Sequence, residues 1–443
     1  MGFLKEALCS LFIICAINTY AQRINVRDYG AKGDGVTNDY LALKKVVNEI
    51  NRNKGGEVYF PSGTYFIGEY HNSDKIADLE YKDCDGLKIY GSNAVISLKG
   101  DFNRAITKKS TKHSFSNIST VIPFMINNCK NVTIENLEIN GSVDKMTRDK
   151  GVVETGGYLL YISESENVTL NNLYLHHAQT DGLVIRGTKK PSFNIKASNV
   201  ISSYNARQGM SIGYLTNGYF TNCKFINTGF SKGNYGNHAP SAGVDIEPST
   251  GDSLKVKDVK FEGCEFSNNL GSQFVVSRPK LTQGIQLKSC VIDSRNSKSM
   301  YTLILAAKNI LIADCEIKCG RGNIYTTWNG MPDGDVRIIN SIIESSARGI
   351  VADANIKSNG ISIENNNLKF TGDFLTSYFP YLQNSNVNFL NNRIFIPSKT
   401  WGARKIQSLV QGVKQSSGNV FYSEENNKKP KVSYQGAKLV NDH

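Results

Sequence analysis

Apolar and polar residues alternate with a period of two over short segments of the chain, and one phrase returns about every 25 residues. The phrase is roughly Asn-Val-x-Ile-x-Asn-Cys-x-Ile, and its copies are NVTIENLEI, NVTLNNLYL, DVKFEGCEF, GIQLKSCVI, NILIADCEI, DVRIINSII, GISIENNNL and NVNFLNNRI. A period of two is typical of β-strands. A repeat of this length, made of short strands and turns, predicts one coil of a parallel β-helix, so the predicted fold class is all-β.

One segment near the start has helical spacing instead. The stretch 38–50 carries apolar residues at Leu41, Leu43, Val46, Val47 and Ile50, and Thr37 and Asn38 are candidate N-caps. We expect an amphipathic helix that covers the open end of the coil stack. The predicted organisation is a signal peptide over 1–21, an N-terminal cap with the first strands over 22–75, the β-helix over 76–400, and a C-terminal cap with a Lys-rich tail over 401–443.

The leader has a charged Lys5, an apolar stretch and the ending Asn-Thr-Tyr-Ala, which predicts cleavage before Gln22 and export from the cytoplasm. We expect a secreted, periplasmic or cell-surface protein with no stable membrane insertion. Seven cysteines remain after the leader, so a fully paired disulfide framework is excluded for a monomer. Four of them hold one place in successive coils and predict a stack of unbonded thiols at a turn: Cys223, Cys264, Cys290 and Cys315.

Two steps between repeats are longer than the others, which predicts inserted loops around 141–158 and 229–241. Loops on a rigid scaffold commonly carry function. A second column of strands accompanies the repeats, and in it alternation places Asp245 and Glu247 on one exposed face, with α-carbons about 6.6 Å apart at a rise of about 3.3 Å per residue. Such a carboxyl pair suits glycoside hydrolysis, so both are predicted to be catalytic.

The neighbouring coils supply candidate substrate contacts. Ser211 flanks Asp245, Arg186 lies two rungs from Glu247, and Gly213 leaves a notch between them for a sugar ring. Tyr214, Tyr325 and Trp328 are further candidates, because aromatic rings stack on sugar faces. Arg278 suits a carboxylate or sulfate group, and His238 lies in the insert directly before Asp245. His176 and His177 are adjacent on a strand, so we expect their rings to face opposite ways.

The opening VRDYGAKGDGVTNDYLALKKVV (26–47), followed by GGEVYFPSGTYFI (55–67), resembles the pectate-lyase-like superfamily, in the branch of rhamnogalacturonases, polygalacturonases and sugar epimerases. The resemblance implies a right-handed, single-stranded parallel β-helix that acts on polysaccharide. It does not select a reaction, because this opening is shared by hydrolases, lyases, epimerases and phage adhesins. In this segment Asp34 is expected to shape a tight turn.

Two further segments are similar to polygalacturonase motifs. TDGLVI (180–185) is similar to their Asn-Thr-Asp segment, and RQGMSIG (207–213) to their Gly-His-Gly segment, but the paired aspartates between them are missing and Gln208 replaces the histidine. Asp181 lies three residues and two rungs from Asp245, roughly 14 Å, which is too far for direct partnership. We therefore expect Asp181, Arg207 and Gln208 to contact substrate or shape a turn.

The formal net charge is +12, which suits an acidic polysaccharide, whereas scattered lysines in an exported chain disfavour nucleic acid. The first hypothesis is a glycoside hydrolase, in which one of Asp245 and Glu247 is the acid and the other activates water, with no cofactor. The alternative is a lyase or C5-epimerase acting on uronic acids: the two carboxylates would hold Ca²⁺, and Arg207, Arg278 or a tyrosine would remove the C5 proton. A non-catalytic glycan-binding protein is the third. Sugar, linkage, endo or exo mode and oligomeric state stay open.

Overall fold

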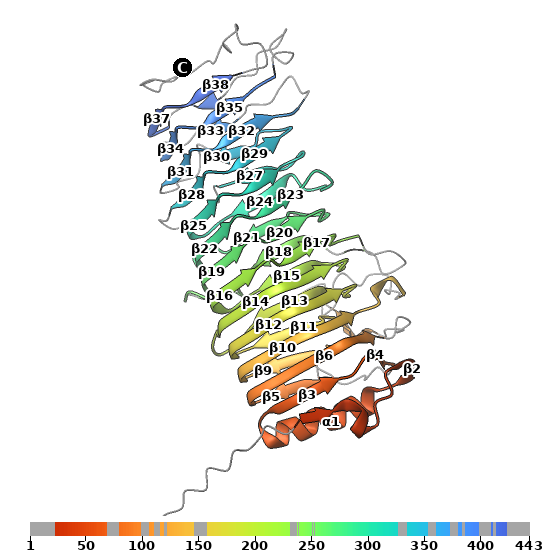
Figure 1. The fold of residues 1–443 in the computed structure, drawn as a ribbon. Helices are drawn as coiled ribbons and strands as arrows, with labels where there is room; N and C mark the ends of the chain where they lie inside the picture. The colour runs from red at the N-terminus through yellow and green to blue at the C-terminus, as the bar shows by residue number, and fades with distance from the viewer. Residues whose placement is uncertain are drawn as a thin grey trace, which may run out of the picture.

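The protein is an elongated parallel β-helix with one α-helix at its N-terminal end (Figure 1). This structure is a computed structural model, and it describes residues 23–68, 79–98, 106–109, 116–118, 122–145, 157–230, 237, 239–249, 251, 253–326, 335–352, 360–372, 380–382, 386–397, 409–410 and 413–422. The predicted leader lies outside these residues. No helix within the described ranges has the length and apolar character needed to cross a membrane.

The strands stack in register into two long sheets. The 12-stranded sheet, called sheet B, contributes one short strand to each coil. Its members are β5 (Glu80–Lys82), β9 (Phe124–Asn127), β11 (Leu160–Ser163), β13 (Asp181–Arg186), β15 (Gln208–Ile212), β18 (Ala242–Ile246), β21 (Phe274–Val276), β24 (Tyr301–Leu305), β27 (Asn323–Tyr325), β30 (Ile350–Ala352), β33 (Tyr381–Leu382) and β36 (Leu409–Val410). Neighbouring strands of this sheet are parallel throughout.

The 24-stranded sheet, called sheet A, wraps the other faces of the solenoid. It holds β1 (Arg23–Asn25), β2 (Asp34–Asn38), β3 (Gly56–Phe60), β4 (Gly63–Ile67), β6 (Asp85–Leu98), β10 (Lys130–Asn140), β12 (Glu166–His176), β14 (Ser192–Ser203), β16 (Leu215–Thr221), β17 (Lys224–Ile226), β19 (Val256–Glu262), β20 (Glu265–Ser267), β22 (Thr282–Lys288), β23 (Val291–Asp293), β25 (Lys308–Ala313), β26 (Glu316–Lys318), β28 (Val336–Ile339), β29 (Ile342–Ser345), β31 (Ile361–Glu364), β32 (Asn367–Phe370), β34 (Val387–Leu390), β35 (Arg393–Phe395), β37 (Gln415–Ser417) and β38 (Val420–Tyr422). A short antiparallel pair, β7 (Ile106–Lys109) and β8 (Ser116–Ile118), stands apart from both sheets.

Alternation along each strand fills the interior of the solenoid. The inward residues predicted for sheet B are buried in one continuous core: Leu183, Ile185, Met210, Ile212, Val244, Ile246, Phe274 and Val276. Where sheet A turns a corner, an asparagine takes a left-handed conformation, as at Asn136 (φ 57°) and Asn172 (φ 51°). Asparagine tolerates this conformation better than most residues, which explains its recurrence in the phrase.

The capping helix is present as α1 (Tyr40–Asn53), so the element was predicted correctly and its start was not. Asp39, rather than Thr37 or Asn38, occupies the N-cap position, and its side chain makes no capping bond. Its carboxylate instead accepts from two backbone N–H groups of the preceding turn. Leu41 is 61 % exposed and Tyr40 is buried in its place, because the helix axis presents residues 40, 43, 46, 47 and 50 to the core.

The smaller predictions for turns are confirmed. Asp34 accepts bonds from the backbone N–H groups of Val36 and Thr37, which closes the expected tight turn. The four stacked cysteines are buried free thiols, and Cys84, Cys129 and Cys319 are free and buried as well. The two insertions fall where expected, between β10 and β11 and between β17 and β18. A 3-10 turn, η2 (Val143–Lys145), opens the first of them, and another, η1 (Val26–Tyr29), follows β1.

Candidate functional site

The outward face of sheet B carries the predicted column of side chains. The register pairs Val184 of β13 with Ser211 of β15, Ser211 with Asp245 of β18, and Asp245 with Val275 of β21. Two residues after Asp245, the backbone N–H of Glu247 donates to the carbonyl of Ile212, which sets Glu247 beside Gly213. The alignment of the coils deduced from the sequence is therefore correct at this point.

The two predicted catalytic carboxyl groups lie in different surroundings. Asp245 is 4 % exposed, so the prediction that it stands on a solvated face is wrong. The Glu247 side chain is 49 % exposed, and its Oε1 lies 3.4 Å from Nη2 of Arg278, a surface contact between two half-exposed groups. Alternation correctly gave the side of the strand for both residues, but neighbouring groups cover only one of them.

The prediction that Asp181 has no connection with Asp245 is also wrong. None of the hydrogen bonds found in the described ranges joins the two carboxylates directly, but two intervening side chains connect them. The Ser211 hydroxyl contacts Asp181 Oδ2 and lies 2.6 Å from Gln208 Oε1, and Gln208 Nε2 lies 2.6 Å from Asp245 Oδ2. Asp181 to Asp245 is thus a continuous row of buried polar groups, which we call the acid row.

Arg207 anchors one end of the acid row. Its Nε lies 2.8 Å from Asp181 Oδ1 and its Nη2 lies 2.5 Å from Asp181 Oδ2, a bidentate ion pair in which the carboxylate is fully buried. Planar two-point contacts of this kind strongly favour the ionised carboxylate. Arg207 was predicted to contact substrate or to act as a base, and the structure places its guanidinium in this internal pair instead.

Burial shifts the ionisation of the row. It raises the pKa of Asp245 to about 7, and the negative charge of Glu247 adds to the rise, while Arg207, Arg186 and the Gln208 amide oppose it. Burial likewise raises the pKa of Asp181 to about 7, against the Ser211 hydrogen bond. Burial lowers the pKa of Arg207 to about 10. Perturbed ionisation of neighbouring buried groups is characteristic of functional sites.

Among the described residues, two buried polar atoms at this site have no hydrogen-bond partner: Oδ1 of Asp245 and Nε of Arg186. One is an acceptor, or a donor when protonated, and the other is a donor. Buried polar atoms are nearly always paired in native proteins, so a water molecule or a ligand is the expected partner for such atoms. The predicted notch at Gly213 is filled, because a Cβ there would lie 3.1 Å from Cγ of Arg186, whose stem crosses the glycine.

The remaining predicted contacts are spread more widely. Tyr214 carries the Lys255 ammonium 4.5 Å from its ring centroid. Tyr325 pairs with Ile304, which pairs with Val275, so it continues the outward column three rungs beyond Asp245 and packs edge-on against Tyr301. His238 and Trp328 lie outside the described residues.

Two tyrosines at the site were missed. Tyr161 of β11 pairs with Val184 and so extends the outward column one rung toward the N-terminus. Tyr158 precedes it, with ring centroids 5.6 Å apart, and lies near enough to Asp181 for that charge to add to the rise that burial causes in the pKa of Tyr158. Extension of the column by one coil from Gly182 would have revealed Tyr161, because the coil YLLYIS keeps the same alternation.

The histidine pair also departs from expectation. His177 has a φ of 57°, which turns its ring toward His176, and the two Nδ1 atoms lie 2.6 Å apart. The Nε2 atoms contact Glu138 at 3.1 Å and Asp144 at 3.4 Å. Strict strand alternation fails here because the left-handed residue ends the strand.

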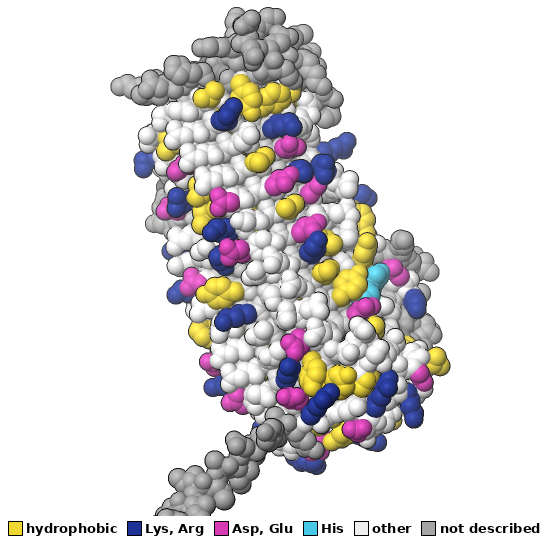
Figure 2. All heavy atoms as spheres, viewed as in Figure 1, with side chains coloured by type: hydrophobic (Ala, Val, Ile, Leu, Met, Phe, Trp, Pro, Cys, Tyr) yellow, Lys and Arg dark blue, Asp and Glu magenta, His cyan; other side chains and the backbone are white. Residues whose placement is uncertain are grey.

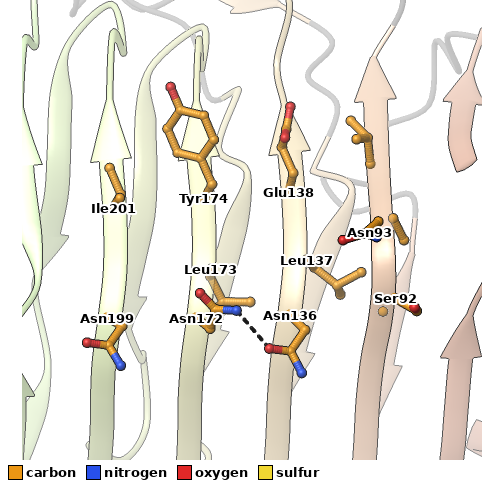
Figure 3. Close-up of a pocket in the computed structure, with 13 residues that line it drawn as sticks. Ser92, Asn93, Asn136, Leu137, Glu138, Asn172, Leu173, Tyr174, Asn199 and Ile201 are labelled. Carbon is orange, nitrogen blue, oxygen red and sulfur yellow. Dashed lines mark hydrogen bonds between the residues drawn. The ribbon is translucent and has the colours of Figure 1, made fainter. Parts of the chain in front are cut away.

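A separate groove of about 510 Å³ lies on sheet A, at the corner formed by β6, β10, β12 and β14 (Figure 3). Asn136 and Asn172 join across it through a 2.8 Å bond, and Glu138 and Tyr174 project from adjacent strands to the same side (Figure 3). The unpartnered buried atoms of the sheet B site do not border this groove. We therefore regard sheet B as the candidate active site, on its chemistry rather than on cavity size.

Over the described part of the chain, no group of three or more His, Cys, Asp or Glu side chains is placed to hold a metal ion.

Comparison with known proteins agrees with this architecture. Residues 23–80 match the family described as rhamnogalacturonase A/epimerase, pectate lyase-like, and residues 124–318 match the right-handed β-helix region. The plasmin and fibronectin-binding protein A of Streptococcus pneumoniae is 26 % identical over 179 residues, which cover 34 % of this chain and 23 % of that protein. The match thus takes in less than a quarter of that relative's length.

Solved structures match over most of the chain. The A-module of the Azotobacter vinelandii mannuronan C-5 epimerase AlgE4 superposes with a TM-score of 0.52 at 16 % identity, covering 94 % of this chain and 100 % of that one. The Yersinia enterocolitica family 28 exopolygalacturonase gives 0.50 at 14 % identity, covering 95 % and 78 %. At such identities the likeness concerns the fold. The chain is a right-handed parallel β-helix protein, and its N-terminal segment is similar to the pectate-lyase-like family of rhamnogalacturonase A and epimerases.

Proposed function

We propose that this protein is a glycoside hydrolase of acidic polysaccharides, with Asp245 as general acid and Glu247 as general base. The observation that carries the proposal is the contrast between the two carboxyl groups of one strand end. Asp245 is buried, its pKa is raised to about 7, and its Oδ1 has no hydrogen-bond partner among the described residues. Glu247, two residues on, is half exposed. Pairs of carboxyl groups in such unequal environments commonly divide into an acid and a base.

The mechanism follows from these positions. Asp245 donates its proton to the glycosidic oxygen as the bond to the anomeric carbon breaks, and Glu247 removes a proton from the water that attacks that carbon. The role of Glu247 as a base on water makes the reaction inverting at the anomeric carbon. A spacing of about 6.6 Å between the α-carbons is compatible with this and also with the shorter carboxyl separation of a retaining enzyme, in which Glu247 would be the nucleophile. Arg186 and Arg278 lie beside the pair and would face an anionic group on the sugar.

Elimination or epimerisation has less support at this site. Arg207, one of the bases considered together with Arg278 and a tyrosine, is held by Asp181 in a bidentate pair. Calcium does not fit the pair well either, because a carboxyl group with a raised pKa is a poor cation ligand and the Arg278 guanidinium already contacts Glu247. We derive no step through calcium. The names of the similar proteins, an epimerase and an exopolygalacturonase, support a polysaccharide substrate without deciding between these reactions.

The test is a panel of uronate-containing and sulfated polysaccharides, incubated with the full chain with and without a chelator. Reducing ends and the ultraviolet absorbance of unsaturated uronides are recorded together. The proposal predicts new reducing ends without that absorbance, unchanged by chelator, and an inverted anomer in the first product detected by NMR. Absorbance that rises with the reducing ends would identify a lyase. Binding without either signal, and without exchange of the C5 proton, would identify a glycan-binding protein.

A further inference from the structure

The acid row contains one hydroxyl and one amide between two carboxyl groups, and its hydrogens can be counted. Ser211 lies within hydrogen-bond distance of Asp181 Oδ2 on one side and of the Gln208 amide on the other. The Gln208 amide in turn lies within hydrogen-bond distance of Asp245 Oδ2. A hydroxyl has one hydrogen, and an amide can give hydrogens only from its nitrogen. The three contacts therefore restrict how many protons the row can hold.

Two arrangements satisfy every contact. In the first, Ser211 donates to Gln208 Oε1 and the amide nitrogen donates to Asp245, so the contact between Ser211 and Asp181 requires a proton on Asp181. In the second, the amide is turned over: Ser211 donates to Asp181, the amide nitrogen donates to Ser211, and the amide oxygen accepts from a protonated Asp245. Each arrangement needs one proton for the two carboxyl groups. Without it, two acceptor oxygens would face each other in the buried row.

The contact with Arg207 favours the second arrangement. Its bidentate contact favours the ionised form of Asp181, which leaves the proton on Asp245. The other charges that face Asp245 are Glu247 on its own strand, which favours protonation, and Arg186 and Arg207, which disfavour it. On the next strand its neighbour is the apolar Val275.

We propose that Ser211 and Gln208 are positioning residues that hold the single proton of the acid row on Asp245. Only the use of that proton in catalysis rests on the proposed function. The row itself is a property of the free protein, and it assigns to Gln208 and Ser211 a role other than the substrate contact predicted from the sequence.

Ser211→Ala tests the row without removing either carboxyl group. Once the hydroxyl is gone, the Gln208 amide is free to turn its nitrogen toward Asp245 and stabilise the carboxylate. The titration midpoint of Asp245 should then fall by about one pH unit or more. Ser211→Thr keeps the hydroxyl and should restore the wild-type midpoint. Ser163→Ala, on the same face but outside the row, is the matched control and should leave it unchanged.

The measurement is carboxyl titration by ¹³C NMR of aspartate-labelled full-length protein without substrate, with Asp245→Asn used to assign the signal. Thermal unfolding of each variant checks that it folds. A wild-type Asp245 that titrates near the ordinary value of about 4, or a midpoint that Ser211→Ala does not move, would overturn the proposal. If the midpoint falls as expected but no polysaccharide is cleaved, the row stands and the hydrolase proposal fails. If cleavage occurs, the alkaline limb of kcat/KM should fall with the same midpoint.

Discussion

The solenoid contains two buried columns of polar side chains, and they differ in one respect. In the asparagine stack, made of Asn366, Asn392 and Asn419, each amide bonds to the next coil. Asn392 Oδ1 accepts from the backbone N–H of Asn366 at 2.9 Å, and Asn392 Nδ2 donates to the Ile363 carbonyl at 2.9 Å and to Asn419 Oδ1 at 3.0 Å. In the sheet B site, Asp245 Oδ1 and Arg186 Nε have no partner within the part of the chain that the structure describes.

This difference is the basis for assigning a structural role to the stack and for proposing a functional role for the sheet B site. A saturated column contributes to stability and offers nothing to a ligand, because its donors and acceptors are already used. In the sheet B site, Oδ1 of Asp245 at the end of the acid row and Nε of the neighbouring Arg186 have no such partner among the described residues. Mutations in the two columns should therefore have opposite signatures: loss of stability in the stack, and loss of activity in the row.

Asp245→Asn should have the largest effect. The amide cannot supply the proton, so hydrolysis should fall by about 10³-fold or more while the fold is kept. Initial rates on the substrate found in the panel, with melting temperatures alongside, provide the measurement. Asp314→Asn, at an exposed left-handed turn position that suits asparagine, is the control and should retain wild-type rates. If the Asp245→Asn variant were fully active, the acid row would not be needed for activity, and the proposed difference in role between the two columns would be wrong.

The second prediction concerns pH. The raised pKa of Asp245 means that the folded protein binds this proton more tightly than the unfolded chain does. The resulting stability is present below about pH 4 and is lost as the pH rises through about 7, by at most about 4 kcal/mol. Because an asparagine amide does not titrate, Asp245→Asn should equal the wild type at low pH and exceed it in unfolding free energy at pH 8. Denaturant unfolding at several pH values measures this, and a constant difference between the two proteins would contradict it.

The third prediction concerns the asparagine stack. Asn392→Ala leaves buried groups in two coils without partners, among them the Asn366 backbone N–H and the Ile363 carbonyl. The free energy of unfolding should fall by about 3 kcal/mol, with little change in catalytic rate. Asn388→Ala, at a half-buried position on the adjoining strand, serves as the comparison and should cost much less. Equal losses from both changes would show that saturation of the stack contributes little.

The smallest effect is expected at the cysteine stack. Its thiols are buried and unbonded, so Cys290→Ala should cost only about 1 kcal/mol, for a small loss of packing. For the same reason a reducing agent should leave the melting temperature of the full chain unchanged, and the described cysteines should all titrate as free thiols after denaturation. A melting temperature that falls on reduction would reveal a disulfide in the stack.

The charges on the surface are compatible with a function that depends on a local site. Lys and Arg side chains alternate with Asp and Glu side chains over the face seen in Figure 2, so the positive net charge is not gathered into one patch there. Interspersed charges of this kind favour solubility and contribute little individually to stability. If the proposed anionic substrate is bound, a local site explains its recognition better than a broad basic surface on this face does.

Much of the fold could be predicted from the amino-acid sequence. The period of two gave the strands, the repeat length gave the coil, and the alignment of coils placed Ser211, Asp245 and Val275 side by side, as the register confirms. In-register stacking depends only on local alternation repeated at a constant interval, which is why residues far apart in the chain can be paired from the sequence.

The tertiary structure decided how deeply these residues are buried and which hydrogen-bond partners they have. Alternation states on which side of a strand a residue lies, but the burial of Asp245 depends on how neighbouring side chains such as Gln208 pack against it. The bridge from Asp181 through Ser211 and Gln208 depends on side-chain rotamers, which reach across the rungs that backbone spacing keeps apart. The sequence by itself therefore determined the scaffold and the row of candidates. Only the packed structure decided that the carboxyl group of Asp245 is buried and that of Glu247 is half exposed, because burial and hydrogen-bond geometry are properties of the assembled coils.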